Sequence, residues 1–135
     1  MSSTPSYSIV IPAYKEVLNI RPLLTRLRAA FSSPASPIPI SAVEVLIVDD
    51  NSRDGSVELV HELQKEGFPV RIVVRTDERG LSSAVVRGFR EARGEAMVCM
   101  DCDLQVSHPL LPGCRPPSIL PAARLDILLY PSSSR

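Results

Sequence analysis

Apolar residues are arranged along this chain in two alternating patterns. Short, nearly continuous apolar runs alternate with longer stretches in which apolar residues recur every three or four positions. The first pattern is typical of buried strands, and the second is typical of helices that bury one face. The runs predict strands over residues 7–11, 43–48, 70–74 and 96–100. The stretches between them predict helices with apolar faces over residues 20–30, 57–63 and 81–92.

Local features of the sequence predict where several elements begin and end. Pro12 is expected to end the first strand, because proline cannot donate a hydrogen bond to a neighbouring strand. Asn19 is expected to cap the first helix, with Pro22 in its first turn. The turn Asp54-Gly55 should open the second helix, and Gly94 should close the third.

The order of these elements predicts a fold class. Strands that are separated by helices pack side by side as a parallel sheet, with the connecting helices on its faces. The chain is therefore expected to form an α/β domain with a mainly parallel sheet flanked by helices. Its 135 residues are about one domain's worth of chain.

Composition narrows the class of protein. Hydrophobic residues make up 44% of the chain and charged residues 22%, a mixture typical of globular domains. Fifteen basic residues balance fifteen acidic ones, which excludes a strong overall field for nucleic acid. We expect no secretory signal and no membrane span, and we expect the three cysteines to be reduced thiols. Six prolines among the last thirty residues mark a composition boundary near residue 106.

Acidic residues gather at the predicted carboxyl ends of the strands, the edge where open parallel sheets bind their ligands. These residues are Glu16, Asp50, Asp101 and Asp103. Carboxylates that converge repel one another unless a cation or a hydrogen-bonding ligand lies among them. The alternative is that the acids are turn or helix-cap residues, which suits Asp49 and Asp54.

The triplet Asp101-Cys102-Asp103 carries the most chemical information. Two carboxylates two positions apart at the end of a strand can point to one side and share a divalent cation. Mg²⁺ and Mn²⁺ prefer oxygen ligands, and Gln105 could add a carbonyl oxygen. The chain has neither G-x-G-x-x-G after its first strand nor G-x-x-x-x-G-K-[ST], which excludes a dinucleotide-binding fold and a P-loop.

Four ordered segments of the chain together resemble family 2 glycosyltransferases. They are residues 8–16, 48–55, 80–84 and 100–105. The resemblance covers about residues 7–105, and it is specific to the family more than to one sugar or acceptor. It implies a Rossmann-like GT-A domain, of which these residues would form the nucleotide-sugar-binding half.

Within that family, the segments most resemble the members that transfer mannose from GDP-mannose to dolichyl phosphate with inversion. The resemblance implies these two compounds as partners, together with Mg²⁺ or Mn²⁺ as cofactor and membrane-anchoring partner subunits. It implies a location at the cytosolic face of the endoplasmic reticulum membrane and a role in protein glycosylation. Because a phosphate acceptor is already anionic at neutral pH, a dedicated general base would not be needed.

Carried over position by position, the resemblance assigns roles to residues of this chain. Those expected to bind the nucleotide or the sugar are Pro12, Tyr14, Glu16, Val48, Asp50, Asp101, Cys102 and Asp103. Val48 and Asp50 would hold the base, and the triplet 101–103 would meet the diphosphate and the sugar. The metal ligands would be Asp101, Asp103 and Gln105, and Asp103 is the expected catalytic residue.

The chain departs from the family pattern at two places. Lys15 stands where the family usually has Asn, beside the expected pocket. The match stops at Gln105, after which residues 106–135 form a Pro- and Ser-rich segment without helical or strand periodicity. We therefore expect a domain over 7–105 and an irregular tail over 106–135. The acceptor half would be missing, so we expect little or no mannosyl transfer from this chain.

Other interpretations stay open at this point. Another family 2 enzyme, such as a polyprenyl-phosphate glucosyltransferase, would share the same motifs. Residues 45–51 also resemble the start of a receiver-type signalling domain, although a strand and a helix precede them. Cys99, Cys102, His108 and Cys114 have the residue types of a zinc knuckle. Against zinc, a strand would aim Cys99 and Cys102 to opposite faces, and Cys99 is expected to be a buried apolar residue.

The basic residues carry less information about function. Arginines recur in and before the third predicted helix, at positions 71, 75, 79, 87, 90 and 93. We expect most of them to form a solvated helix face. Arg75 and Arg79, which follow the third strand, are the ones that could reach a diphosphate.

Overall fold

The structure is a computed structural model of the chain that describes residues 4–100, 102 and 130–131. Strands and helices alternate in the predicted order: β1 (Tyr7–Ala13), α1 (Val17–Ser32), β2 (Val43–Asp49), α2 (Ser56–Lys65), β3 (Val70–Val74), α3 (Leu81–Glu91) and β4 (Ala96–Cys99). A short 3-10 helix, η1 (Ile40–Ala42), precedes β2, and a short strand, β5 (Tyr130–Pro131), lies in the tail. The predicted alternation from β1 to β4 is confirmed.

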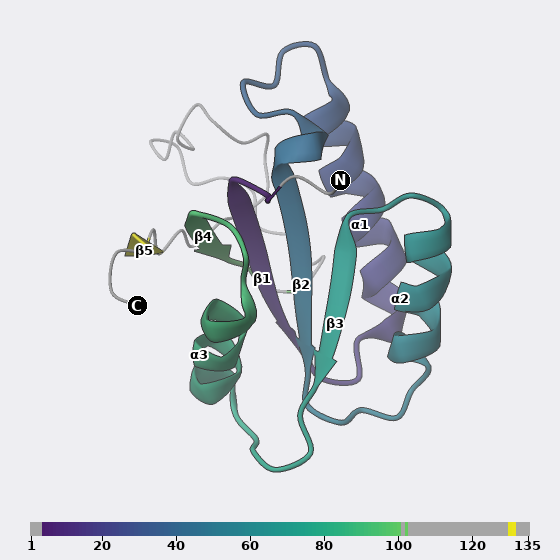
Figure 1. The fold of residues 1–135 in the computed structure, drawn as a ribbon. Helices are drawn as coiled ribbons and strands as arrows, with labels where there is room; N and C mark the ends of the chain where they lie inside the picture. Colours follow the sequence, from purple (N-terminus) through teal and green to yellow (C-terminus); the bar gives the residue numbers. More distant parts are fainter. Residues whose placement is uncertain (1–3, 101, 103–129, 132–135) are drawn as a thin grey trace, which may run out of the picture.

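The strands form one sheet in the order β3-β2-β1-β4-β5. The central strand β1 pairs in parallel with β2 and β4, and β3 pairs in parallel with β2. Figure 1 shows α1 and α2 on one face of this sheet and α3 on the other. The predicted α/β class, a parallel sheet flanked by helices, is therefore confirmed.

Successive residues of the inner strands face opposite layers of the core. Ile9 and Ile11 of β1 lie in the larger apolar cluster with α1 and α2, whereas Val10 lies in the smaller cluster with α3. Along β2, Val45 lies in the larger cluster and Leu46 in the smaller one. Because both faces are covered, these strands are apolar almost without interruption.

The first strand is longer than predicted, because β1 continues through Pro12 to Ala13. The Met100 N–H donates to the Val10 carbonyl at 3.0 Å, and the Asp50 N–H donates to the Ala13 carbonyl at 3.1 Å. The backbone N–H and C=O groups of even-numbered β1 residues therefore point toward β4, and those of odd-numbered residues point toward β2. The backbone nitrogen of Pro12 points toward β4. Val10 is the last β1 residue that pairs with β4, so Pro12 lies beyond this pairing and its missing N–H breaks no hydrogen bond there.

The first helix begins earlier than predicted. Glu16 is its N-cap and Val17 its first residue, so Asn19 lies inside the helix and is not the cap. Pro22 also lies inside α1, beyond the first turn. The reason is a contact distant in sequence: the Val17 N–H donates to the carboxylate of Asp54 at 3.3 Å, which satisfies one of the free N–H groups of the helix start.

Gly94 does not end α3, which stops at Glu91. It lies in the turn before β4, where its N–H donates to the Ser8 hydroxyl at 2.8 Å. A Cβ atom at this position would come within 2.6 Å of the Ser8 backbone nitrogen, so glycine is required. At the start of α3, Leu81 was expected on the buried face but is 63% exposed. Helical spacing assigns the face of a residue, whereas only the packing shows that the buried part of α3 begins at Ala84.

Two arginines of the β3 region hold the ends of α3. Arg71 Nη2 donates to the carbonyl of Glu91 at 2.8 Å, and Arg75 Nη2 donates to the carbonyl of Gly80 at 2.9 Å. Arg75 has a fully buried side chain, and Arg71 is 26% exposed. The prediction of a solvated helix face is therefore wrong for Arg71, which belongs to β3 and points toward the α3 side of the sheet. Arg75, which was expected to be able to reach a diphosphate, is instead buried on the same side.

Of the predicted tail over 106–135, the structure describes residues 130–131. They pair antiparallel to β4, with Tyr130 opposite Met97, and form an edge strand that the sequence pattern did not predict. In the described part of the chain, no helix combines the length and the apolar character needed to cross a membrane.

Candidate functional site

Three loops follow the carboxyl ends of β1, β2 and β3, at the edge of the sheet where ligands were expected (Figure 1). They comprise residues 14–16, 50–55 and 75–80. The Lys15 N–H donates to the Ser52 hydroxyl at 2.7 Å, and the Gly80 N–H donates to the Asp50 carboxylate at 3.1 Å. The loop after β2 is therefore bonded to the loops on both sides of it.

Asp50 is held by a buried arginine. Arg75 Nε donates to Asp50 Oδ1 at 2.6 Å, and Arg75 Nη2 forms an ion pair with the same carboxylate. Arg75 Nη1 donates to the Ser83 hydroxyl at 2.7 Å and lies 3.4 Å from the Glu78 carboxylate. The Asp50 side chain stays 13% exposed, so its orientation is fixed while part of it remains open to a ligand.

Asp49 lies beneath this edge and does not reach it. It is 2% exposed, and its Oδ2 accepts the Ser52 N–H at 3.0 Å while its Oδ1 accepts the Ser52 hydroxyl. The same hydroxyl accepts the Lys15 N–H. Asp49 is thus the turn residue that the alternative interpretation described.

Asp54 connects the starts of two helices. Its Oδ1 accepts the Ser56 N–H at 3.2 Å and the Ser56 hydroxyl, and its Oδ2 accepts the Val17 N–H. Burial raises the pKa of Asp54, but the hydrogen bonds from Ser56 and Val17 outweigh burial and leave the pKa below its usual value. Asp54 therefore acts as an ionised cap for both α1 and α2.

The residues expected to line the nucleotide pocket lie at two levels. Tyr14 is 46% exposed and Glu16 is half-buried, both in the loop after β1. Pro12 and Val48 are buried within their strands, and Val48 packs in the cluster under α3. The structure brings Tyr14, Glu16 and Asp50 to one edge of the sheet and places the side chains of Pro12 and Val48 below it.

Part of the predicted site lies outside the described residues, namely Asp101, Asp103 and Gln105. Among the residues that the structure does describe, no group of three or more His, Cys, Asp or Glu side chains could hold a metal ion. Cys102 is described, and its side chain is 2% exposed within the larger apolar cluster. A contact of Cys102 with a diphosphate or sugar therefore stays a prediction, and its side chain faces the core.

The cysteines of the zinc hypothesis differ in burial. Cys99 was expected to be buried but is only half-buried, and Cys102 is the buried one. Cys99 is the last residue of β4 and lies beyond Ala96 and Met97, the two residues that pair with β5. His108 and Cys114, the other two residues of that hypothesis, lie outside the described residues.

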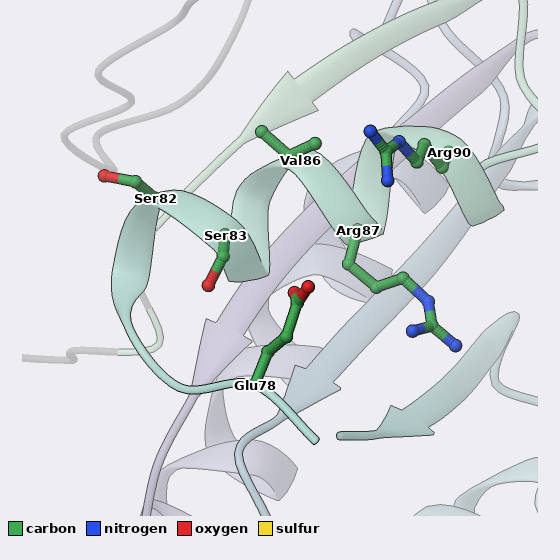
Figure 2. Close-up of a pocket in the computed structure, with 6 residues that line it drawn as sticks. All are labelled: Glu78, Ser82, Ser83, Val86, Arg87 and Arg90. Atoms are coloured by element: carbon green, nitrogen blue, oxygen red, sulfur yellow. The ribbon is translucent and has the colours of Figure 1, made fainter. Parts of the chain in front are cut away.

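A hollow along α3 contains none of the predicted site residues. Its volume is about 290 Å³, and it is lined by Glu78, Ser82, Ser83, Val86, Arg87 and Arg90. Figure 2 shows Glu78 reaching from the preceding loop toward the helix that carries the other five. Arg87 is paired with Glu91 at 3.1 Å, and Ser83 and Glu78 are also partners of Arg75. The hollow therefore lies beside the loop of residues 75–80, and its lining does not include Tyr14, Glu16 or Asp50.

The sequence did not predict the roles of two residues that organise this edge, Arg75 and Ser52, although Arg75 was named as able to reach a diphosphate. Arg75 directly follows a strand, which was the available indication, but its fully buried side chain and its pairing with Asp50 become visible only in three dimensions. Ser52 lies in a segment that resembled the family, yet its bond to Lys15 joins residues 37 positions apart.

The fold and the site define a class of protein. A parallel sheet with helices on both faces and charged residues at its carboxyl ends is typical of α/β domains that bind nucleotides. The chain shares its fold with a mannosyltransferase from Pyrobaculum calidifontis that was solved in complex with GDP-Man and Mn²⁺, with a TM-score of 0.61 and 26% identity. That match covers 76% of this chain and 28% of the other. The predicted GT-A type of fold is thereby confirmed.

The sequence profile described as "Glycosyl transferase family 2" matches residues 8–116, and the chain belongs to this family. Two similar curated relatives are named dolichol-phosphate mannosyltransferase. The one from Mycosarcoma maydis is 66% identical over 108 residues, and the one from Saccharomyces cerevisiae is 57% identical over 103 residues. These matches cover 80% and 76% of this chain, which spans 36% of the length of each relative. The predicted family is confirmed, and the receiver-domain alternative is excluded.

Proposed function

We propose that this chain carries the donor-binding part of a glycosyltransferase that moves mannose from GDP-mannose to dolichyl phosphate. The names of the two fungal relatives support the sugar and the acceptor, and the structural neighbour with GDP-Man and Mn²⁺ supports the donor. The observation that carries the proposal is the shared edge of Tyr14, Glu16 and Asp50, whose loops are joined by the Lys15–Ser52 bond. Ligands of open parallel sheets bind at this edge.

The residues at the edge suit different parts of the nucleotide. Asp50 presents a partly exposed carboxylate that can accept a hydrogen bond from the base, with Val48 beneath it. Tyr14 offers an exposed ring, and Glu16 offers a half-buried carboxylate for hydroxyl groups. Pro12 forms the floor of the pocket in this proposal. Asp50 is the residue most sharply oriented before any ligand arrives, because Arg75 and the Gly80 N–H hold it.

We assign the divalent metal, Mg²⁺ or Mn²⁺, to Asp101, Asp103 and Gln105. These residues fit a hard cation, because all three supply oxygen donors. They follow β4 in the sequence, and β4 lies beside β1 and runs parallel to it, so the carboxyl end of β4 lies at the same edge of the sheet as the carboxyl end of β1. When bound, the metal would neutralise charge on the leaving diphosphate. Asp101 and Asp103 would face the diphosphate and the sugar, with Asp103 as the catalytic residue. Cys102, whose side chain faces the core, would meet them through its backbone.

The acceptor in this proposal is a lipid phosphate, which would be met at a membrane surface. We infer the cytosolic face of the endoplasmic reticulum, a role in protein glycosylation and membrane-anchoring partner subunits. Catalysis requires donor and acceptor to be held in line, and orientation can supply roughly 7–11 kcal/mol of the barrier. Since the matched part of this chain spans 36% of the length of each of the two fungal relatives, we expect residues 1–135 alone to bind donor and transfer little mannose.

Titration of residues 1–135 with GDP-mannose in the presence of Mn²⁺ tests the donor assignment. We expect saturable binding that GDP displaces and UDP-glucose does not. Preference for UDP-glucose would instead favour the alternative, another family 2 enzyme such as a polyprenyl-phosphate glucosyltransferase. Absence of binding by any nucleotide sugar would overturn the proposal. Transfer from radiolabelled GDP-mannose to dolichyl phosphate, measured beside an intact relative, tests the expectation of low activity.

A further inference from the structure

Left-handed backbone is concentrated in the two loops that flank the proposed nucleotide site. In the part of the chain that the structure describes, the non-glycine residues with positive φ are Lys15 at 53°, Asn51 at 58° and Arg53 at 52°. This conformation is unfavourable for most residues and persists only where surrounding contacts impose it. The loops after β1 and β2 must therefore be held by specific bonds.

Ser52 and Asp54 supply those bonds from the loop after β2. The Ser52 hydroxyl accepts the Lys15 N–H at 2.7 Å, and Asp54 Oδ2 accepts the Val17 N–H at 3.3 Å. The first of these N–H groups belongs to the peptide after Tyr14, and the second belongs to the peptide after Glu16. The two bonds therefore hold the short segment Tyr14–Glu16 at both of its ends.

Both acceptors are themselves immobilised by rigid elements. Ser52 is 9% exposed and is bonded through its N–H and its hydroxyl to Asp49, the last residue of β2. Asp54 is bonded to Ser56, the first residue of α2. These bonds thus fix the position of the loop after β1 relative to the end of the central strand β2 and the start of helix α2.

We propose that Ser52 and Asp54 are positioning residues of the nucleotide site, which hold Tyr14 and Glu16 in their binding positions without touching the ligand themselves. This inference rests on the proposed function, in which Tyr14 and Glu16 line the pocket. It divides the segment 49–54 into two roles. Asp50 faces the ligand, whereas Ser52 and Asp54 brace the neighbouring loop.

The test compares Ser52→Ala with Thr25→Ala. The Thr25 hydroxyl also makes one hydrogen bond, to the Arg21 carbonyl at 2.8 Å, but it lies on the exposed side of α1. In Ser52→Ala we expect amide hydrogen exchange at Lys15 to accelerate about tenfold or more, since the N–H loses its acceptor. We also expect the dissociation constant of GDP, measured with Mn²⁺, to rise about five- to tenfold. Ser52→Thr, which keeps the hydroxyl, should restore both, and Thr25→Ala should change neither.

Asp54→Ala provides a second variant should Ser52→Ala fail to fold, because it leaves the Asp49–Ser52 pair intact. Its expected effects are faster exchange at Val17 and the same weakening of GDP. Unchanged exchange at Lys15 and Val17 would overturn the proposal. So would faster exchange with unchanged GDP affinity at a temperature where the variant is fully folded, since the bonds would then be structural ties alone. If the unaltered chain binds no GDP, the proposed function fails, and the exchange rates by themselves decide whether Ser52 and Asp54 hold the segment.

Discussion

Two charge pairs connect β2 with β3, one at each end of these strands. Glu44 and Arg71 form the pair at the amino end, with a distance of 3.1 Å, and Asp50 and Arg75 form the pair at the carboxyl end. Both lie on the α3 side of the sheet, and the smaller apolar cluster packs between them. The two pairs consist of the same kinds of residue, so their surroundings account for the difference between them.

At the amino end, every partner of Glu44 belongs to a turn or strand of the core. Glu44 accepts hydrogen bonds from the Ser8 hydroxyl at 2.6 Å, the Arg93 N–H at 2.6 Å and Arg71 Nε. Burial raises the pKa of Glu44, but the bonds from Ser8 and Arg93 and the charge of Arg71 outweigh burial and lower it. The hydrogen-bond donors of this carboxylate all come from the folded chain itself, and its role is to join β1, β2, β3 and the turn before β4.

At the carboxyl end, the partners of Asp50 come from loops. The Gly80 N–H and Arg75 hold it. Its own loop contains the left-handed residue Asn51, and the loop after β1 contains the left-handed residue Lys15. The loops at the carboxyl ends form the edge at which open parallel sheets bind their ligands, whereas the amino ends have no such role. The comparison teaches that the place of a charge pair in the sheet, more than its chemistry, separates a structural pair from one that presents a binding group.

The substitution Arg75→Met, compared with Arg71→Met, should give the largest effect. Arg75→Met removes a fully buried cation and leaves the Asp50 carboxylate without its partner. We therefore expect the free energy of unfolding to fall by about 3–5 kcal/mol and GDP binding to be lost. Arg71→Met should cost less, about 1–3 kcal/mol, because Glu44 keeps its other two donors. Urea denaturation and calorimetry measure both quantities. Loss of GDP binding in both variants would contradict the distinction between a structural pair and a pair that presents a binding group.

Asp50→Ala should weaken GDP and GDP-mannose by about 1–3 kcal/mol, the cost of removing one partner of a buried hydrogen bond. It should leave inorganic pyrophosphate nearly unaffected, because Asp50 is assigned to the base. The matched control is Glu44→Ala, which lowers stability but should leave GDP affinity within about twofold, a few tenths of a kcal/mol, at a temperature where it is folded. Equal losses for GDP and pyrophosphate would move Asp50 from the base to the phosphates or the metal.

The amino-end pair should appear in the acid dependence of stability. The pKa of Glu44 is lowered in the folded chain from an ordinary value of 4.5. Its contribution is therefore fully present above pH 4.5 and is lost as the pH falls through the lower, folded-state pKa. Between about pH 5.5 and 3, we expect the unfolding free energy to fall more steeply for the unaltered chain than for Glu44→Gln. Parallel curves from urea denaturation across that range would show that Glu44 is not held as described.

Lys15→Asn should give the smallest effect and in the opposite direction. Lys15 has a φ of 53°, a conformation that Asn tolerates better than Lys, and its N–H bond to Ser52 does not depend on its side chain. We expect a gain of about 0.5 kcal/mol in the free energy of unfolding. Lys65→Asn, at the end of α2, should instead lose a few tenths of a kcal/mol. A loss in both variants would show that the left-handed backbone at Lys15 is not strained.

The same backbone angle explains why a family pattern with Asn at position 15 was informative although this chain has Lys. The sequence indicated only that Lys replaces Asn, a small polar change beside a pocket. The backbone angle φ of Lys15 shows that this position needs a residue that tolerates the left-handed conformation. Asp49 is the opposite case. The sequence already suited it to a turn, and its burial and its bond from the Ser52 N–H agree with that interpretation.

The sequence by itself determined the elements of this protein and the edge where its chemistry lies. Apolar runs and helical spacing are local properties, so they were enough for the strands, the helices and the parallel sheet. Tertiary structure decided which polar residues meet. Arg75 and Asp50 are 25 positions apart, and Lys15 and Ser52 are 37 apart, so no local pattern contains either bond. A side chain's partner and burial depend on what the rest of the chain packs against it, and these decided that Arg75 is buried, that Pro12 lies within a strand and that α1 begins before Asn19.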